Sequence, residues 1–578
     1  MKKLLIGNAA VARGAYEAGV SVVSSYPGTP STEITECIVE YKDINVEWAS
    51  NEKVSAEVSI GASIAGARSM SCMKHVGLNV MADPVFTVSY TGVNGGLVFC
   101  VADDPGMHSS QNEQDSRHYA KAAKVMMLEP SDSSECKEYT KLAFKLSEEF
   151  DTPVFIRLST RVSHSQGLVE LCDKEKYVLK DYNKNIAKYV MMPGNAIKRH
   201  VIVEERQLKE VEFANTTDLN KIEKNNSKIG VITSGITYMY AKEALKNKVD
   251  YLKLGMVYPL PTDLITDFAK NYDEVYIVEE LDPFIEEHVK ALGIKCKGKE
   301  LFTLLGEYTP KMIKKAILGI EENNFIEVNE QIPARPPVMC AGCPHRGTFY
   351  VLKKLGVTVS GDIGCYTLGA VAPLQSVDTT ICMGASISAG FGMAKARGEE
   401  FNKKLVSVIG DSTFIHSGIT GLIDIVYNKG ANTVIILDNS ITGMTGHQQN
   451  PTTGKTIRLE ETSQVNLIKL AEAVGVKRIV VADPFDVKNF ERVVKEELNA
   501  NEPSVIIAQR PCALLKTVKY VGQCNVNDNC KKCKQCLKLG CPAISLVDGN
   551  VVIDKNQCNG CGLCINVCPF NAIEKVGE

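Results

Sequence analysis

The sequence of 578 residues lacks several features that mark particular classes of protein. Its formal net charge at pH 7 is −3, so there is no basic excess of the kind that nucleic-acid-binding proteins carry. No apolar run reaches the roughly 18 residues of a membrane-spanning helix. There is no low-complexity segment, no short-period repeat of the solenoid type and no G-x-G-x-x-G fingerprint for a nicotinamide cofactor. We therefore predict neither nucleic acid nor a membrane as a partner.

The start of the chain needs separate attention because MKKLLIGNAAVARGAYEAG resembles a signal peptide. Gly7 and Asn8 interrupt its apolar run, so we interpret it as a first strand entering a helix. Composition is that of an ordinary globular protein, 44% hydrophobic and 23% charged. The sequence predicts a cytoplasmic protein.

The length exceeds what one hydrophobic core organises, and the pattern changes several times along the chain. Short apolar runs such as VSVVSSYP, GGLVFCVADDP and TPVFIRLS alternate with the helix-like SAEVSIGASIAGA, which predicts βαβ units on a parallel sheet. KIGVITSG opens a second α/β segment, and the Pro-rich VNEQIPARPP marks a boundary. The sequence predicts an α/β protein with a first domain (residues 1–180), a connector (181–227) and a middle domain (228–325). A third α/β domain (335–515) and a cysteine-rich tail (520–578) follow.

Eight of the twenty cysteines fall in two tight groups near the end of the chain. The groups are Cys530, Cys533, Cys536, Cys541 and Cys558, Cys561, Cys564, Cys568. Such grouping in a protein that is not exported indicates metal ligation in a reducing compartment. A structural zinc site also uses C-x2-C spacing and is the alternative.

The second group has the C-x2-C-x2-C-x3-C-P spacing of bacterial ferredoxins, and the first has one extra residue before its last cysteine. In two-cluster ferredoxins the fourth cysteine of each run ligates the other cluster. This resemblance implies two [4Fe–4S] clusters, in which Cys568 completes the first group and Cys541 completes the second. The extra residue enlarges a loop without removing a ligand.

In the third domain, the stretch from Lys404 to Gly446 reads strand, helix, strand. Asp411 follows the first strand and Asn439 the second, at the carboxyl edge where open α/β sheets bind ligands. Two oxygen ligands there, with Gly410 allowing close approach, suit Mg²⁺ bound to a diphosphate. The alternative is an ordinary βαβ unit in which the aspartate and asparagine are turn residues.

This stretch resembles the thiamine diphosphate motif, which begins GDG and ends in an asparagine pair; here the sequence has GDS and DNS. The resemblance implies that the side chains of Asp411 and Asn439 and the carbonyl of Ile441 bind Mg²⁺. Gly410 and Ser412 belong to the same cofactor-binding loop.

The motifs CAGCPHR, GDIGCYTLG and CMGASIS resemble the cofactor half of 2-oxoacid:ferredoxin oxidoreductases. The resemblance implies a third [4Fe–4S] cluster beside thiamine, held by Cys340, Cys343, Cys365 and Cys512. The alternative is that these cysteines line a tight phosphate-binding loop, because free cysteine is a common buried residue.

Two first-domain motifs also match this family. NEKVSAEVSIGASIAGARS selects Glu52 as the carboxylate that thiamine needs on its aminopyrimidine ring, with Glu57 as a local rival. YPGTPSTE places Thr29 near the substrate's keto acid. A turn entering a helix capped at Ser31 or Thr32 explains the same residues without a function.

The order of the segments resembles that of the larger subunit of the family members that act on indolepyruvate and other arylpyruvates. The motifs CAGCPHR, HSGI and MTGHQ favour this branch of the family over the branch that acts on pyruvate. The resemblance implies oxidative decarboxylation with coenzyme A (CoA), ferredoxin as electron acceptor, and a small beta subunit carrying the family's gamma-type domain. Another 2-oxo acid, a non-redox thiamine decarboxylase or synthase, and a non-enzymatic electron-carrying subunit are the alternatives. His108, His345 and Arg346 lie near the cleft in family terms and receive no role.

Overall fold

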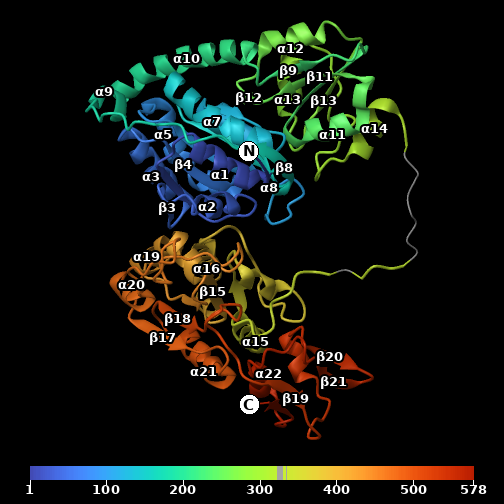
Figure 1. Cartoon of the computed structure of the whole chain (residues 1–578). Helices are drawn as coiled ribbons and strands as arrows, with labels where there is room; N and C mark the ends of the chain where they lie inside the picture. The colour runs from blue at the N-terminus through green and yellow to red at the C-terminus, as the bar shows by residue number, and fades with distance from the viewer. Residues whose placement is uncertain (322–329, 334, 578) are drawn as a thin grey trace. The chain divides into compact units, whose positions relative to one another are not determined.

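The structure is a computed structural model that describes residues 1–321, 330–333 and 335–577 (Figure 1). The chain divides into two compact units, residues 1–328 and 329–578. The first unit contains the predicted first domain, connector and middle domain, and the second contains the predicted third domain and tail.

Parts of three predicted segments lie outside the described residues. They are residues 322–325 of the middle domain, residues 328, 329 and 334 of the Pro-rich boundary, and residue 578 of the tail. Among the described helices, none is both long and apolar enough to cross a lipid bilayer.

A seven-stranded sheet forms the centre of the first unit, in the order β12-β6-β7-β5-β4-β2-β3. Neighbouring strands are parallel except β12, which runs antiparallel to β6. The strands are β2 (Val22–Ser25), β3 (Asn45–Trp48), β4 (Ser69–Lys74), β5 (Leu97–Asp103), β6 (Met126–Leu128), β7 (Val154–Ser159) and β12 (Met256–Tyr258). Their apolar runs are nearly continuous because both faces of the sheet are covered.

Strand β5 shows this double burial directly. Val98 and Cys100 enter one core cluster with residues of α1 and α7, whereas Phe99 and Val101 enter a second cluster with residues of α5. The helices of this part are α1 (Gly7–Glu17), α2 (Thr32–Ile38), α3 (Glu52–Ile64), α4 (His75–Val80), α5 (Ala82–Thr91), α6 (Arg117–Ala123), α7 (Ser133–Phe150) and α8 (Thr160–His164). As predicted, the chain starts with a strand that enters a helix: β1 (Lys2–Ile6) pairs with β8 (Gln166–Glu170) and leads into α1.

The connector, residues 181–227, contains regular secondary structure. It forms α9 (Ile186–Tyr189), the long helix α10 (Pro193–Thr216) and β9 (Lys221–Glu223). Helix α10 packs against α5 and α12, and β9 joins the sheet of the middle segment.

The middle segment is a four-stranded sheet in the order β13-β10-β11-β9. Its own strand β12 leaves that sheet to pair with β6, which ties the segment to the first domain. The remaining elements are β10 (Ile229–Ser234), α11 (Gly235–Leu245), η1 (Lys246–Lys248), β11 (Asp250–Leu254), α12 (Thr262–Ala269), β13 (Glu274–Val278), α13 (Phe284–Ala291) and α14 (Pro310–Leu318).

The second unit is built on a five-stranded parallel sheet in the order β14-β15-β16-β18-β17. Its strands are β14 (Thr358–Ser360), β15 (Leu405–Gly410), β16 (Thr433–Asp438), β17 (Arg478–Ala482) and β18 (Ser504–Gln509). Its helices are α15 (His345–Leu355), η2 (Cys365–Ala370), α16 (Ala385–Arg397), α17 (Glu399–Asn402), α18 (Asp411–Thr413), the π-helix η3 (Phe414–Gly418), α19 (Ile419–Tyr427), α20 (Leu467–Ala473) and α21 (Val487–Leu498).

The cysteine-rich tail folds onto this sheet domain. It contains β19 (Gln523–Val526), η4 (Gln535–Leu539), β20 (Ile544–Val547), β21 (Asn550–Ile553), α22 (Leu563–Val567) and β22 (Ile573–Val576), with β19–β22 and β20–β21 as antiparallel pairs. Cys524 and Leu563 share one core cluster with Phe349 and Phe485. The tail and the third α/β segment are therefore parts of the same compact unit.

Candidate active site

The oxygen atoms predicted to bind Mg²⁺ converge in the second unit. β15 and β16 are adjacent, so Asp411 and Asn439 leave neighbouring strand ends. Asn439 Oδ1 lies 2.7 Å from Ile441 O and 3.3 Å from Asp411 Oδ1. Adjacent ligands of an octahedral Mg²⁺ lie about 3 Å apart, because each metal–oxygen bond is about 2.1 Å. The three oxygen atoms therefore fit this cation. Alternatively, the Asn439 amide could be rotated so that its nitrogen donates hydrogen bonds to Ile441 O and Asp411 Oδ1.

The buried carboxyl group of Asp411 also suits a bound cation. Asp411 is 2% exposed. Burial and the neighbouring Asp438 raise the pKa of Asp411 to about 7, opposed by hydrogen bonds from the Ser412 amide and the Thr452 hydroxyl. A divalent cation at this position would favour the ionised carboxylate.

Gly410 and Ser412 each lie against a neighbouring loop. A Cβ on Gly410 would lie 2.7 Å from Tyr366 Cε1, so this glycine makes room for the ring of Tyr366. Ser412 Oγ accepts a hydrogen bond from Thr442 Oγ1 at 3.0 Å. The two residues thus link the GDS turn to the GDIGCYTLG and DNSITG loops.

The four cysteines predicted to hold a third cluster are close neighbours. Burial, together with the neighbouring Cys512 and Cys340 thiols, raises the pKa of Cys365 to about 11. Burial also raises the pKa of Cys343, to about 12, with Cys365 and Cys340 acting in the same direction. The amide of Cys512 donates to Asn439 O at 2.9 Å. This cysteine set therefore directly adjoins the predicted metal loop.

The tail cysteines line two separate cavities. Cys541, Cys558, Cys561 and Cys564 line the first. Cys530, Cys533, Cys536 and Cys568 line the second. The folded tail thus places each fourth cysteine with the three cysteines of the other run, the exchange that the ferredoxin resemblance implies. Ligation itself stays a prediction.

Sulfur spacing bears on the zinc alternative. Tetrahedral zinc with sulfur ligands at about 2.3 Å needs sulfur atoms about 3.8 Å apart. Among the described residues, no three cysteine sulfurs lie within 4.8 Å of one another. This spacing differs from that of a closed zinc site, and zinc stays the alternative to an iron–sulfur cluster.

In the first unit, Glu52 and Glu57 have opposite environments. Glu52 is the first residue of α3, where the Asn51 side chain accepts a hydrogen bond from Val54 N at 2.9 Å. Glu52 is 4% exposed and packs against Gly77 of α4, where an added Cβ would lie 2.6 Å from Glu52 Oε1. Glu57 has a side chain 47% exposed and pairs with Lys53. Burial thus distinguishes Glu52 from its rival.

Thr29 follows β2 and is half-buried at the carboxyl edge of the large sheet. Its carbonyl accepts a hydrogen bond from Ser109 Oγ at 3.1 Å. The neighbouring Ser31 hydroxyl donates to Gly28 O rather than capping α2. The structure therefore ties Thr29 to the loop that follows β5.

The three residues without a predicted role lie in different surroundings. His108 is nearly half-exposed and pairs with Glu307 at 3.1 Å. His345 is buried, and its Nε2 lies 3.4 Å from Asn439 Nδ2. Arg346 is buried between the CAGCPHR loop and the tail.

Three family models match the chain. Residues 13–230 match the thiamine-diphosphate-binding domain of pyruvate flavodoxin/ferredoxin oxidoreductase, and residues 362–508 match the C-terminal domain of thiamine pyrophosphate enzymes. Residues 551–574 match a 4Fe–4S binding domain.

Curated relatives match the chain almost end to end, among them two archaeal proteins. The indolepyruvate oxidoreductase subunit IorA of Archaeoglobus fulgidus is 40% identical over 614 residues, which span 99% of this chain and 97% of that protein. The subunit of the same name from Thermococcus kodakarensis is 40% identical over 629 residues, covering 100% and 97%. The chain belongs to the IorA family. The family resemblance and the α/β-plus-ferredoxin fold predicted from the motifs are confirmed.

Among solved structures, the IorA-family chain aligns with 2-oxoglutarate:ferredoxin oxidoreductase from Magnetococcus marinus. The TM-score is 0.48 and the identity 19%, over 55% of this chain and 65% of that one.

Sequence reasoning on this IorA-family chain missed Lys74 and His75, which come just before Gly77, the residue that packs against Glu52. Lys74, at the end of β4, is buried and donates to Ser109 O at 2.9 Å; burial lowers its pKa to about 8, while Asp104 and Glu52 oppose this shift. His75 is 1% exposed and neither ring nitrogen has a hydrogen-bond partner. No local motif marks them, because the position of β4 next to β2 depends on the parallel pairing of these strands.

A ninth tail cysteine was also missed. Cys524 lines the same cavity as Cys558 and Cys564, and its amide donates to Cys558 Sγ at 3.3 Å. It stands alone in sequence, outside both C-x2-C runs. Only the pairing of β19 with β22 brings it to the cavity.

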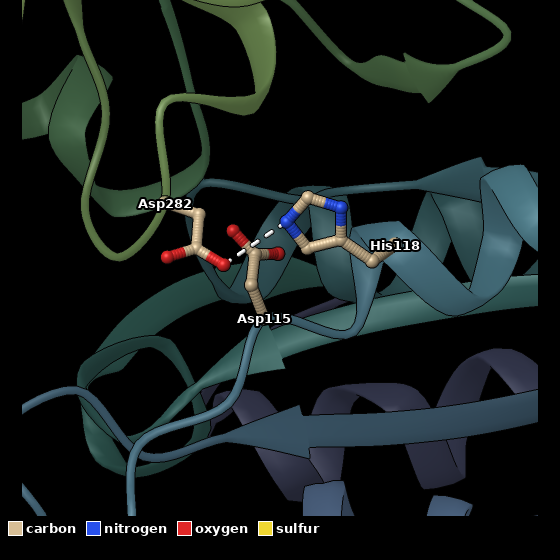
Figure 2. Close-up of side chains that lie close together, drawn as sticks. All are labelled: Asp115, His118 and Asp282. Carbon is tan, nitrogen blue, oxygen red and sulfur yellow. Dashed lines mark hydrogen bonds and ion pairs between the residues drawn. The ribbon is translucent and has the colours of Figure 1, made fainter.

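One further group of possible metal ligands carries no assignment. Figure 2 shows Asp115, His118 and Asp282 close together, with His118 Nε2 3.0 Å from Asp282 Oδ2. Both oxygens of Asp115 already accept hydrogen bonds from Arg117, at 2.8 and 2.5 Å. The guanidinium occupies the lone pairs that a metal would need and adds a positive charge.

Proposed function

We propose that this chain is the thiamine-dependent subunit of an enzyme that oxidises arylpyruvates such as indolepyruvate. In the overall reaction, a 2-oxo acid and CoA give acyl-CoA, CO₂, one proton and two electrons, and the electrons reduce ferredoxin. The full-length relatives named indolepyruvate oxidoreductase support the substrate class. Other 2-oxo acids of the same family are the alternative substrates.

The contact between the cysteine set and the metal loop is the observation that carries this proposal. The Cys512 amide donates to the carbonyl of Asn439, the residue that also offers its side-chain oxygen to the predicted Mg²⁺ site. A non-redox thiamine decarboxylase has no use for an electron acceptor at this position. The juxtaposition therefore favours oxidation over simple decarboxylation.

Thiamine diphosphate, when bound, supplies the carbanion chemistry that cleaves the 2-oxo acid, and [4Fe–4S] clusters supply one-electron acceptors. Asp411, Asn439 and the Ile441 carbonyl would hold Mg²⁺ and with it the diphosphate. Glu52 would hold a proton at the aminopyrimidine ring, since its buried carboxylate is shielded from water. Thr29 would contact the keto acid from the loop after β2.

The tail supports an electron path out of the protein. Its two cavities would hold two [4Fe–4S] clusters, and Cys340, Cys343, Cys365 and Cys512 would hold the third. A small beta subunit, external ferredoxin and CoA complete the proposed reaction. The cytoplasmic location is part of the proposal, because exposed thiolate ligands require a reducing compartment.

The test is anaerobic reduction by substrate. The full chain is purified with its small partner, supplied with thiamine diphosphate and Mg²⁺, and mixed with CoA and either indolepyruvate or pyruvate. Visible absorbance and electron paramagnetic resonance follow cluster reduction, and CO₂ is measured in parallel. We expect rapid reduction by indolepyruvate and little by pyruvate.

Each other result has a defined meaning. Reduction by pyruvate alone keeps the mechanism and rejects the substrate. CO₂ release without cluster reduction supports the non-redox decarboxylase, and neither signal with any 2-oxo acid supports an electron-carrying subunit.

A matched pair of variants in α3 tests the role of Glu52. We expect Glu52→Gln to lower the rate of substrate-driven reduction at least about 100-fold, the usual scale for loss of a general acid–base group. Glu57→Gln removes an exposed carboxylate five positions later and serves as the control. Equal rates in the two variants would reject the assignment of Glu52.

A further inference from the structure

A single arginine side chain joins the tail to the CAGCPHR loop. Arg346 Nη1 donates to Leu539 O in the tail at 2.6 Å. Its Nη2 donates to Met339 O at 2.6 Å and to Cys340 O at 3.1 Å. The guanidinium therefore bridges a backbone turn of the first tail run and the backbone that carries the first two cysteines of the predicted third cluster.

Carbonyl oxygens, and no carboxylate of the described residues, accept hydrogen bonds from Arg346. The residue is 2% exposed, its Nε has no hydrogen-bond partner, and no carboxylate in the described parts of the chain pairs with it. A buried cation without a compensating anion is strongly unfavourable. Arg346 also lines the cavity formed by Cys541, Cys558, Cys561 and Cys564. A [4Fe–4S] cluster with four thiolate ligands is a negatively charged group, so its presence there would supply the missing anion.

The extra residue of the first tail run lies at this contact. The run from Cys536 to Cys541 is one residue longer than the ferredoxin spacing, and Leu539 and Gly540 form its turn. Gly540 has φ +65°, and a Cβ there would lie 2.5 Å from Pro373 Cδ and 3.4 Å from Arg346 Nη1. The longer run thus presents the Leu539 carbonyl to Arg346 in a turn that requires glycine.

The second tail run reaches the same loop. Asn559, next to Cys558, donates to Ala341 O at 3.0 Å. An added Cβ on Gly342, where φ is +74°, would lie 2.3 Å from Asn559 Nδ2. The second tail run therefore holds the Ala341–Gly342 backbone directly, whereas the first run reaches the neighbouring Met339–Cys340 backbone through Arg346.

We propose that Arg346 is a positioning residue of the electron path, acting as the buried counter-charge of the cluster held by Cys541, Cys558, Cys561 and Cys564. In this proposal, the extra residue before Cys541 lengthens the turn so that the Leu539 carbonyl reaches Arg346. That contact holds this cluster, and not the other tail cluster, against the Cys340–Cys343 loop. The inference rests on the proposed function only in taking the tail cysteines as iron–sulfur ligands.

A defined shift in redox behaviour follows from the charge. One-electron reduction adds a negative charge to the cluster, and a nearby cation stabilises the reduced form. We expect Arg346→Gln to shift the one-electron equilibrium of this cluster toward its oxidised form about tenfold, equivalent to a potential about 59 mV more negative. Arg346→Lys keeps the charge and should retain most of the potential.

The experiment is a mediated redox titration of the full chain with its partner subunit, followed by electron paramagnetic resonance. Mediators replace the 2-oxo acid, so failure of the proposed substrate chemistry does not affect the result. Lys555→Gln is the matched control, because Lys555 is an exposed cation of the tail that lines neither of the two cysteine cavities. A shift of one cluster in Arg346→Gln, absent from Arg346→Lys and from the control, supports the proposal. Unchanged potentials in Arg346→Gln, or an equal shift in Arg346→Lys, overturn it.

A second variant tests the role of the longer run and keeps the proposal falsifiable if Arg346→Gln loses iron. Deleting the exposed Lys538 restores the ferredoxin spacing between Cys536 and Cys541. We expect this deletion to retain the tail iron, to lower the potential of the same cluster, and to increase hydrogen exchange at the amides of residues 340–343. Native potential and native exchange in the deletion variant reject the proposal, whatever the behaviour of Arg346→Gln.

Discussion

Replacing Gly77 by alanine should move Glu52 without touching it chemically. A Cβ at Gly77 would lie 2.6 Å from Glu52 Oε1 and 2.7 Å from Glu52 Cγ. Ordinary contacts between such atoms are about 3.5 Å, so the carboxylate must move by about 1 Å. A misplacement of that size can cost about 100-fold in rate. We expect a loss of that order in Gly77→Ala.

The stability of this variant should fall only moderately. Alanine within helix α4 gains about 1 kcal/mol of helix propensity, and overpacking costs about 1–3 kcal/mol, so the net loss is at most about 2 kcal/mol. Gly61→Ala is the control, because Gly61 lies in α3 with Glu52 and an added Cβ meets nothing within 4 Å. That control should keep its rate and gain about 1 kcal/mol.

Two assays separate the effects of Gly77→Ala. Substrate-driven cluster reduction measures the overall rate, and exchange of the thiamine C2 proton with deuterium measures the step that depends on Glu52. In a Glu52→Gln background, Gly77→Ala should have no further effect. A rate within threefold of the parent chain in Gly77→Ala would refute the reasoning.

Three further predictions follow from other parts of the molecule. Asp411→Asn should weaken the Mg²⁺-dependent binding of thiamine diphosphate at least about tenfold, because the cation loses a charged oxygen ligand. Calorimetric titration measures this affinity, and Asp424→Asn, at an exposed position, is the control that should leave it unchanged. Cys541→Ser should remove one tail cluster from the iron count and from the resonance spectrum, whereas Cys524→Ser should keep both; iron loss in Cys524→Ser would contradict the ligand sets. Burial lowers the pKa of His75 to about 4 from an ordinary value of 6.5, so between these values the unfolded chain binds a proton that the folded chain does not. The free energy of unfolding of the first unit should therefore be constant above pH 6.5 and fall by about 3 kcal/mol as the pH drops to 4. The fluorescence of Trp48, the one tryptophan of the chain, can follow urea unfolding at each pH, and His75→Leu should flatten this dependence.

Sequence spacing alone carried the identification of the cysteine and metal motifs. Ligands of a cluster or a cation that lie within one short run, or at the ends of two adjacent strands, leave a local signature. The C-x2-C-x2-C runs and the GDS and DNS turns have this property, and the strand–helix–strand order around Asp411 and Asn439 is the one predicted. The matching family models confirm the fold and the family that these motifs indicated.

Tertiary structure decided the features that depend on residues far apart in the chain. Arg346 and Leu539 are 193 residues apart, and no pattern in either segment predicts their contact. Gly77 faces Glu52 because α4 follows β4 and α3 packs against both β2 and β4. Strand β12 leaves the middle segment for the first sheet, which composition could not show.

The physical reason for this division is the range of the interactions involved. Turn geometry, ligand spacing and strand patterning act over a few residues and are therefore written in short stretches of sequence. Burial, counter-charge and close approach depend on which distant surfaces pack together. The cysteine runs and the Asp411–Asn439 pair were accordingly visible in the sequence, whereas the neighbours of Glu52, the position of Cys524 and the burial of Arg346 were decided by the folded chain.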